Sequence, residues 1–296
     1  MLWIGIALLT PILHAWSNVI DTYLTNRLVR NVWSLGFFTG VFAVIFLPIV
    51  LLIQWPQMPP LQLIPYFFLI GAIEVFYLFP YYKSLQKEDT SIVAALFSLG
   101  KFFVPIFSFV FAGEVLRLSQ YVGFFFIVTA SMFLSLNRVD KIRLNISFFY
   151  MLFSGFLLAI EAVVYKYVLE SVSWSTAVVS TSIFSCLIVL SFLFLPRVRR
   201  DLLEQVRQLR DVAGLFTLNE FIAFGGNIVS PYIVSLVPVT VAKSVEGLQP
   251  FFVLLYAIIF RRWLPGVFQE KVDWRMVLKK ATLFAWMIAG VVLVVG

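Results

Sequence analysis

The feature that most constrains this chain is its division into apolar blocks of roughly 20 residues, the length of a helix that crosses a bilayer. Hydrophobic residues make up 61% of the 296 residues and charged residues only 12%, whereas a soluble domain carries about 25% charged residues. The mean hydropathy is +0.99. The blocks do not alternate between apolar and polar residues, which excludes a β-barrel. The sequence therefore predicts a polytopic, all-α membrane protein.

The blocks predict ten transmembrane helices. Their expected ranges are 2–24, 33–54, 61–83, 90–111, 118–136, 146–168, 173–195, 212–235, 239–260 and 276–295. The first block lacks a basic segment before it and a small-residue cleavage site after it, so we expect a retained helix rather than a signal peptide. In the longest connection, Val198, Leu202, Val206 and Leu209 form one apolar face among arginines, as in a helix that lies on the membrane surface.

The two halves of the chain resemble each other. Residues 15–24 align with 159–168, and residues 90–103 align with 239–252, in the same order. Five helices per half reverse the direction in which the second half enters the membrane, so we expect an inverted repeat, a pattern typical of transporters. The expected repeats are residues 1–140 and 141–296, within one integral membrane unit. Chance similarity between apolar segments is the alternative.

Positive charge predicts the orientation. Eighteen of the 22 Lys and Arg residues lie after the first, third, fifth, seventh and ninth blocks. By the positive-inside rule, that side faces the cytoplasm. We therefore expect a cell-membrane protein whose two termini are both non-cytoplasmic, and we attribute the net charge of +7 to topology rather than to nucleic-acid binding.

Ionisable residues occur in the interiors of six of the ten blocks, away from their ends. They are His14, Asp21, Glu74, Lys101, Glu161, Glu220, Lys243 and Glu246. A charge at bilayer depth costs roughly 2.5–3.5 kcal/mol, so it faces a bundle interior or water. The six helices thus surround a polar cavity, and the second, fifth, seventh and tenth screen it from lipid. On the first helix, His14, Ser17, Asn18 and Asp21 share one face and look into this cavity.

The stretch FAGEVLRLSQYVGFFFIVTASMFLSL at 111–136 resembles the "GE-x-L then a final helix" ending of EamA-type members of the drug/metabolite transporter (DMT) superfamily. The resemblance implies a ten-helix inverted-repeat fold, a central cavity lined by helices 1, 3, 4, 6, 8 and 9, and movement of small metabolites. The chain departs from the family in having Lys101 where a proline is usual. In the second half, the corresponding proline is present as Pro250. The second GE is replaced by RRWLPG at 261–266. Family members are commonly drawn with cytoplasmic termini, opposite to the charge count.

Aromatic side chains accompany two of the carboxylates. Tyr77 and Tyr81 share the face of Glu74, a pattern that suits an ammonium group through charge and cation–π attraction. Glu74 in this setting also suits proton coupling; the structural alternative is an ion pair with Lys101. Glu161 shares a face with Ser154 and Tyr165. Trp16 and Tyr165 are candidate ring walls, although packing is the alternative for the tryptophan.

The remaining candidates have equally plain structural alternatives. Glu220 shares a stripe with Thr217 and Asn227, whereas Asn219 points elsewhere, and interhelical hydrogen bonding is the alternative there. Lys243 and Glu246, three positions apart, are expected to pair within one helix. Lys101 pairs with Glu74 or Glu246, or meets a substrate carboxylate. His14 relays protons or forms a structural hydrogen bond. Candidate substrate-binding or coupling residues are therefore His14, Trp16, Asn18, Asp21, Glu74, Tyr77, Tyr81, Lys101, Glu161, Tyr165, Glu220, Asn227, Lys243 and Glu246.

Several other activities find no support in the sequence. There is no phosphate-binding GxxxxGK motif, one His and one Cys cannot build the usual zinc site, and Cys186 has no disulfide partner. We expect no cofactor, no metal and no enzyme activity. The GFFTG pattern at 36–40 predicts close helix packing within a monomer, with dimerisation as the alternative.

These observations predict a secondary transporter that moves a small amine or zwitterion, such as an amino acid, by alternating access. Five acidic cavity candidates against two lysines favour such a substrate over a polyanion. Its partners are the metabolite and the lipid bilayer, and proton coupling stays open. The alternatives are a transporter of another metabolite class, a non-transporting membrane subunit or scaffold, and an intramembrane lipid enzyme. The scaffold has no need of charges on six helices, and the enzyme would need a nucleophile–base or metal set that the sequence lacks.

Overall fold

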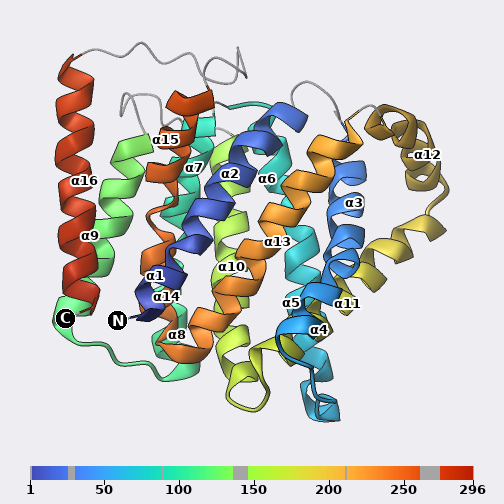
Figure 1. The fold of residues 1–296 in the computed structure, drawn as a ribbon, viewed down its shortest axis with the longest axis horizontal. Coiled ribbons are helices and arrows are strands. Elements are labelled where there is room, and N and C mark those ends of the chain that lie inside the picture. The colour runs from blue at the N-terminus through green and yellow to red at the C-terminus, as the bar shows by residue number, and fades with distance from the viewer. Residues whose placement is uncertain are drawn as a thin grey trace.

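The computed structural model describes residues 2–25, 31–88, 90–135, 146–210, 212–260 and 274–295, and its regular elements there are all helices (Figure 1). The helices of the first half are α1 Leu2–Ala7, α2 Leu9–Tyr23, α3 Val32–Ile45, α4 Leu47–Ile53, α5 Ile64–Phe76, α6 Leu78–Leu85, α7 Thr90–Gly100, α8 Phe103–Ala112 and α9 Leu118–Ser135. Those of the second half are α10 Ile146–Leu169, α11 Trp174–Ser191, α12 Pro196–Arg210, α13 Ala213–Leu236, α14 Val239–Glu246, α15 Gln249–Phe260 and α16 Trp274–Val295. Short 3₁₀ turns at Leu61–Leu63 and Phe192–Phe194 extend α5 and α11.

Several predicted helices consist of two shorter ones. Breaks occur at Leu8, at Tyr77, at Lys101–Phe102 and at Gly247–Leu248. Each break lies two to four residues before a proline, at Pro11, Pro80, Pro105 and Pro250 respectively. Proline lacks an amide hydrogen, and its ring clashes with the carbonyl group one turn earlier, so the helix is interrupted there. The residues at the breaks keep backbone hydrogen bonds to neighbouring turns, so the segments bend there without coming apart.

Six segments of the described chain are long and apolar enough to cross a membrane. They are Leu2–Tyr23, Val32–Ile53, Leu61–Leu85, Ile92–Ala112, Ile146–Leu169 and Trp174–Phe194, and Leu118–Leu134 and Thr282–Val295 are shorter apolar helices. Large apolar side chains on the outside of the bundle, such as Phe109, Phe149 and Leu187, are more than half exposed. Such a surface suits lipid rather than water. The chain is an integral, multi-pass membrane protein.

Packing between the two halves dominates the bundle. The main helix pairs are α9 with α16, α2 with α13, α5 with α11, and α7 with α10. Phe67, Phe124 and Phe216 are among the largest fully buried side chains. The two ends of the chain lie at the same end of the bundle, and α12 lies at its edge (Figure 1).

The GFFTG pattern packs within the monomer. A Cβ atom on Gly40 would lie 2.7 Å from Val189 of α11, and one on Gly36 would lie 3.3 Å from Phe79 of α6. The two glycines therefore let α3 approach its neighbours closely, which confirms the predicted packing role. The predicted apolar face of the surface helix falls on α12, where Leu202 is buried and Val206 is half exposed.

Candidate functional site

A cavity of about 200 Å³ lies between the two halves and collects the predicted site residues. It is lined by every candidate except Trp16, namely His14, Asn18, Asp21, Glu74, Tyr77, Tyr81, Lys101, Glu161, Tyr165, Glu220, Asn227, Lys243 and Glu246. On α2, the lining residues follow the helical spacing of the predicted polar stripe. Trp16 is two positions away from Asn18 and points to the opposite side of the helix. Its ring meets Tyr256 edge-on, with the centroids 5.5 Å apart, so the predicted ring wall is wrong for this residue.

Two helices without ionisable residues also line the cavity, contrary to the prediction that they only screen it. Thr39, Gly40 and Ala43 of α3 contribute to the wall, as does Ser185 of α11. Thr39 and Ser185 bring hydroxyl groups to the wall, and Gly40 and Ala43 are small. The prediction missed these two helices because it considered only charges, whereas a polar wall also needs uncharged hydrogen-bonding groups. Among the described residues, α9 and α16 contribute none to the lining.

Asp21 forms a buried network with residues of α2, α6 and α13. Its Oδ1 accepts a hydrogen bond from Asn219 Nδ2 at 2.9 Å, and Ser17 Oγ lies 3.5 Å from Oδ2. The Tyr81 hydroxyl lies 3.1 Å from Asp21 Oδ2 and 2.8 Å from Asn18 Oδ1. Asn219 was predicted to point away from the cavity residues, but it is 1% exposed and contacts Asp21. Thr217 was predicted to share the stripe of Glu220, but its side chain is exposed.

Hydroxyl groups hold two further carboxylates. Thr39 Oγ1 donates to Glu220 Oε1 at 2.9 Å and lies 3.3 Å from the Tyr82 hydroxyl. Glu74 accepts from Tyr165 at 2.9 Å through Oε1 and from Ser185 at 2.6 Å through Oε2. The predicted alternative of a Glu74–Lys101 ion pair is not found among the described residues, where Glu74 contacts hydroxyl groups of α10 and α11 instead.

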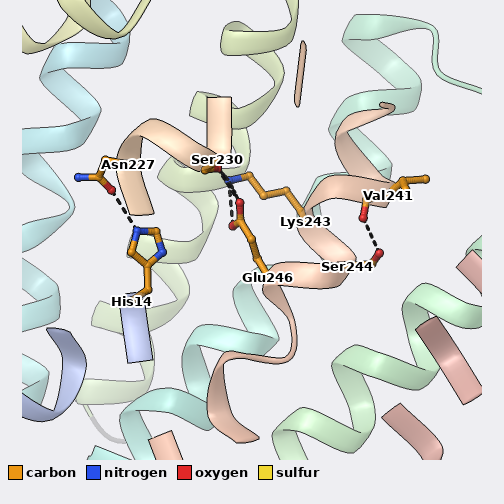
Figure 2. Close-up of polar contacts among 7 residues, drawn as sticks. All are labelled: His14, Asn227, Ser230, Val241, Lys243, Ser244 and Glu246. Carbon is orange, nitrogen blue, oxygen red and sulfur yellow. Dashed lines mark hydrogen bonds and ion pairs between the residues drawn. The ribbon is translucent and has the colours of Figure 1, made fainter. Parts of the chain in front are cut away.

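A second polar cluster lies near the break between α14 and α15 (Figure 2). Lys243 Nζ lies 2.9 Å from both Glu246 oxygens, and Ser230 Oγ donates to Glu246 Oε1 at 2.6 Å. This confirms the predicted pair within one helix. His14 Nε2 lies 3.1 Å from Asn227 Oδ1, within hydrogen-bonding distance.

Two charged lining residues have no such partner. Within the described parts of the chain, the side chains of Lys101 and Glu161 form no hydrogen bond or ion pair, although both line the cavity. The Lys243–Glu246 pair acts electrostatically on both of them, and Glu74 acts on Glu161 as well. One ammonium and one carboxylate are thus available to a bound solute. The described residues include no group of three or more His, Cys, Asp or Glu that could hold a metal ion.

The GE motif clamps the second half of the chain to the first. Gly113 ends α8 in the left-handed conformation, with φ of 63°, which glycine adopts without strain. Glu114 then reaches the start of α14, where its Oε1 accepts from the Val239 backbone amide at 2.8 Å, while Ser108 Oγ donates to Oε2. A carboxylate is favourable at a helix N-terminus. Beside it, Lys166 Nζ donates to the carbonyls of Val234 and Val237 at the end of α13.

Residues 1–136 match the sequence model of the EamA-like transporter family. The match confirms the resemblance predicted from the GE motif and is consistent with the DMT superfamily. The EamA-like segment contributes α2, α3, α5, α6, α7 and α8 to the cavity. The predicted RRWLPG departure in the second half, at 261–266, lies outside the described residues.

The other comparisons bear on the fold. A search of curated proteins finds no match. A crystal structure of another protein is similar over 99% of this chain and 94% of its own, with a TM-score of 0.58 and 13% sequence identity. That likeness extends the shared fold across both halves of the chain, beyond the EamA-like segment.

Proposed function

We propose that this EamA-like chain is a secondary transporter of the drug/metabolite type that moves a small amine or zwitterion, such as an amino acid, by alternating access. The observation that carries the proposal is the presence of Lys101 and Glu161, opposite in charge and without partners, in one cavity. A buried charge is costly unless it is paired. A solute with an ammonium and a carboxylate group would neutralise both.

The size and walls of the cavity suit such a solute. A protein cavity of about 150 Å³ can hold benzene, so about 200 Å³ suits a molecule the size of an amino acid. Tyr77, Tyr81 and Tyr165 present rings at the wall, and an aromatic face attracts an ammonium group by roughly 0.5–2 kcal/mol.

The proposed architecture is ten transmembrane helices in two inverted repeats, with a boundary at residues 140–141 that lies outside the described residues. Corresponding helices are interrupted in both halves, at Lys101–Phe102 and at Gly247–Leu248, and paired interruptions of this kind point to a midplane binding site. Helix pairing supports the repeat as well. The contact of α7 with α10 has its counterpart in α15 with α2, and that of α2 with α13 has its counterpart in α10 with α5 and α6.

We place the protein in the cell membrane with both termini on the non-cytoplasmic side, and we take it to act as a monomer coupled to protons. The positive charge of the loops supports this orientation, and the two chain ends lie at one end of the bundle (Figure 1). A tag fused to the C-terminus should be reached by an impermeant reagent from outside intact cells. Accessibility from the cytoplasm alone would reverse the orientation.

Thermal unfolding of the purified protein tests the substrate class. The probes are choline as a cation, L-alanine as a zwitterion and succinate as an anion, with Lys101→Met and Glu161→Gln beside the wild type. L-alanine should raise the Tm of the wild type and of Glu170→Gln, an exposed residue outside the cavity, but not that of the two cavity variants. Stabilisation by succinate alone, or stabilisation by L-alanine that survives both cavity substitutions, would contradict the proposal.

A further inference from the structure

The Tyr81 hydroxyl lies between two acceptor oxygens although it has one hydrogen to donate. Its oxygen is 2.8 Å from Asn18 Oδ1 and 3.1 Å from Asp21 Oδ2. Both distances are those of real hydrogen bonds. Tyr81 is 3% exposed and Asp21 is 7% exposed, so both groups are largely withdrawn from the outside of the bundle. If each contact is a separate hydrogen bond, one of them receives its hydrogen from the residue opposite Tyr81, that is, from Asp21 or Asn18.

The arrangement is satisfied when Asp21 carries a proton. Tyr81 then donates to the Asn18 carbonyl oxygen, and Asp21 Oδ2 donates to the Tyr81 oxygen. The other oxygen of Asp21 accepts from Asn219 Nδ2 at 2.9 Å, as the carbonyl oxygen of a carboxylic acid would. With Asp21 ionised, no hydrogen lies between one pair of oxygens unless the Asn18 amide turns over and donates through Nδ2.

We propose that Asp21 is the proton-binding group of the transport cycle and that Tyr81 and Asn18 respond to its protonation. This inference rests on the proposed transport function. A proton from water on one side of the membrane bonds to Asp21 Oδ2, which converts the carboxylate into a carboxylic acid. When this proton leaves Asp21 for water on the other side of the membrane, the carboxylate is restored and the Asn18 amide turns over. No electrons are transferred.

The described groups that surround Asp21 include no cation in contact with it, so its negative charge is left for a proton to neutralise. The titratable groups that face it are Tyr81 and Tyr82 of α6, Tyr77 between α5 and α6, and Glu220 of α13. The helices α1 and α7 bring no charged side chain to it. Of the remaining titratable groups on elements packed against α2, Lys243, Glu246 and Lys101 lie near His14, Tyr256 lies against Trp16, and Lys83 of α6 lies over the ring of Tyr150. Among the described residues, no Lys, Arg or His contacts Asp21.

The other cavity carboxylates are arranged differently. Glu246 contacts an ammonium group, and Glu220 accepts from Thr39. Both oxygens of Glu74 accept from hydroxyl groups, of which Ser185 also faces the carbonyls of Gly71 and Thr181. At Asp21, the tyrosine hydrogen is shared with the Asn18 carbonyl oxygen, while Ser17 and Asn219 also approach the carboxyl group. Asp21 is also the one aspartate that falls within a predicted membrane span, so a label on aspartates distinguishes it from the glutamates of the cavity.

Infrared difference spectroscopy of the protein in lipid, recorded between acidic and alkaline buffer, tests the proton site with the proton itself as the probe. The wild type should show a carboxylic acid carbonyl band that titrates, that disappears in Asp21→Asn and that persists in Glu220→Gln. Tyr81→Phe should shift the band, because the acid loses its acceptor. Labelling all aspartates with carbon-13 at the carboxyl group should move the band without any substitution. A band that persists in Asp21→Asn or fails to move with the label overturns the proposal.

A transport measurement separates this inference from the proposed function. Vesicles that contain the protein and an internal pH dye are given L-alanine outside. The wild type should exchange labelled L-alanine and acidify the interior, and Asp21→Asn should exchange without acidification. An equal dye response in Asp21→Asn overturns the proton site. Absence of exchange by the wild type contradicts the proposed function instead, and the infrared result still decides where the proton binds.

Discussion

At the scale of single residues, hydrogen-bond partners separate the structural charges of the cavity from the available ones. Lys243 and Glu246 neutralise each other, and their side chains are 19% and 12% exposed. Lys243→Met leaves Glu246 buried without its cation, which should cost about 3–5 kcal/mol of stability. Lys243→Met combined with Glu246→Met should recover most of the loss, since neither charge remains. Unfolding of the three variants in one detergent gives the coupling energy. Additive losses in the double variant would show that the pair does not act as a unit.

Some of these residues were predictable and others were not, for a physical reason. The 3.6-residue period placed His14, Asn18 and Asp21 on one face, and the structure puts all three at the cavity wall. Asn219 was missed because its partner lies 198 positions earlier in the chain. A single sequence gives the face of a helix but not the neighbour that the face meets. Thr39 was missed because a search for charges passes over hydroxyl groups.

At the scale of elements, the GE motif joins the loop after α8 to the start of α14. Glu114→Ala removes the carboxylate from the Val239 amide and should lower stability by about 0.5–2 kcal/mol, the usual cost of losing a helix N-terminal cap. Glu170→Ala, an exposed acidic residue, should lower it far less. Thermal unfolding of both variants measures the difference. Equal Tm values for the two would show that the clamp does not stabilise the bundle.

A close crossing between α7 and α10 also depends on single residues. A Cβ atom on Gly100 would lie 2.5 Å from the Cα of Gly155, so the two backbones touch. Gly100→Ala should therefore cost about 1–3 kcal/mol through overpacking. Gly214→Ala is the matched control, because nothing lies within 4 Å of the added atom, and it should be neutral or slightly stabilising. A Gly100→Ala protein as stable as this control would contradict the crossing.

The elements themselves were largely predictable. Helices occupy the stretches where apolar segments were predicted, because roughly 20 apolar residues can satisfy their backbone in lipid only as a helix. The interruptions before Pro11, Pro80 and Pro250 were not predicted, although the prolines are visible in the sequence. Length and hydropathy describe a segment as a whole, and they do not register the loss of a single backbone hydrogen bond inside it.

At the scale of the whole molecule, the packing of each half against the other creates the cavity. Neither half encloses it alone, because Asp21 and Glu74 come from the first half and Glu161 and Glu220 from the second. The sequence predicted this union from the distribution of charges over six helices. The contribution of α3 and α11 to the wall depended on tertiary contacts, and only the structure revealed it.

The measurement that tests the central claim most directly is exchange of labelled L-alanine by the purified protein in lipid vesicles, for the wild type, Lys101→Met, Glu161→Gln and Glu170→Gln. The account predicts rapid exchange by the wild type and by Glu170→Gln, and its loss in both cavity variants. Exchange that is undiminished in Lys101→Met and Glu161→Gln would contradict the claim that the two unpaired charges bind the solute.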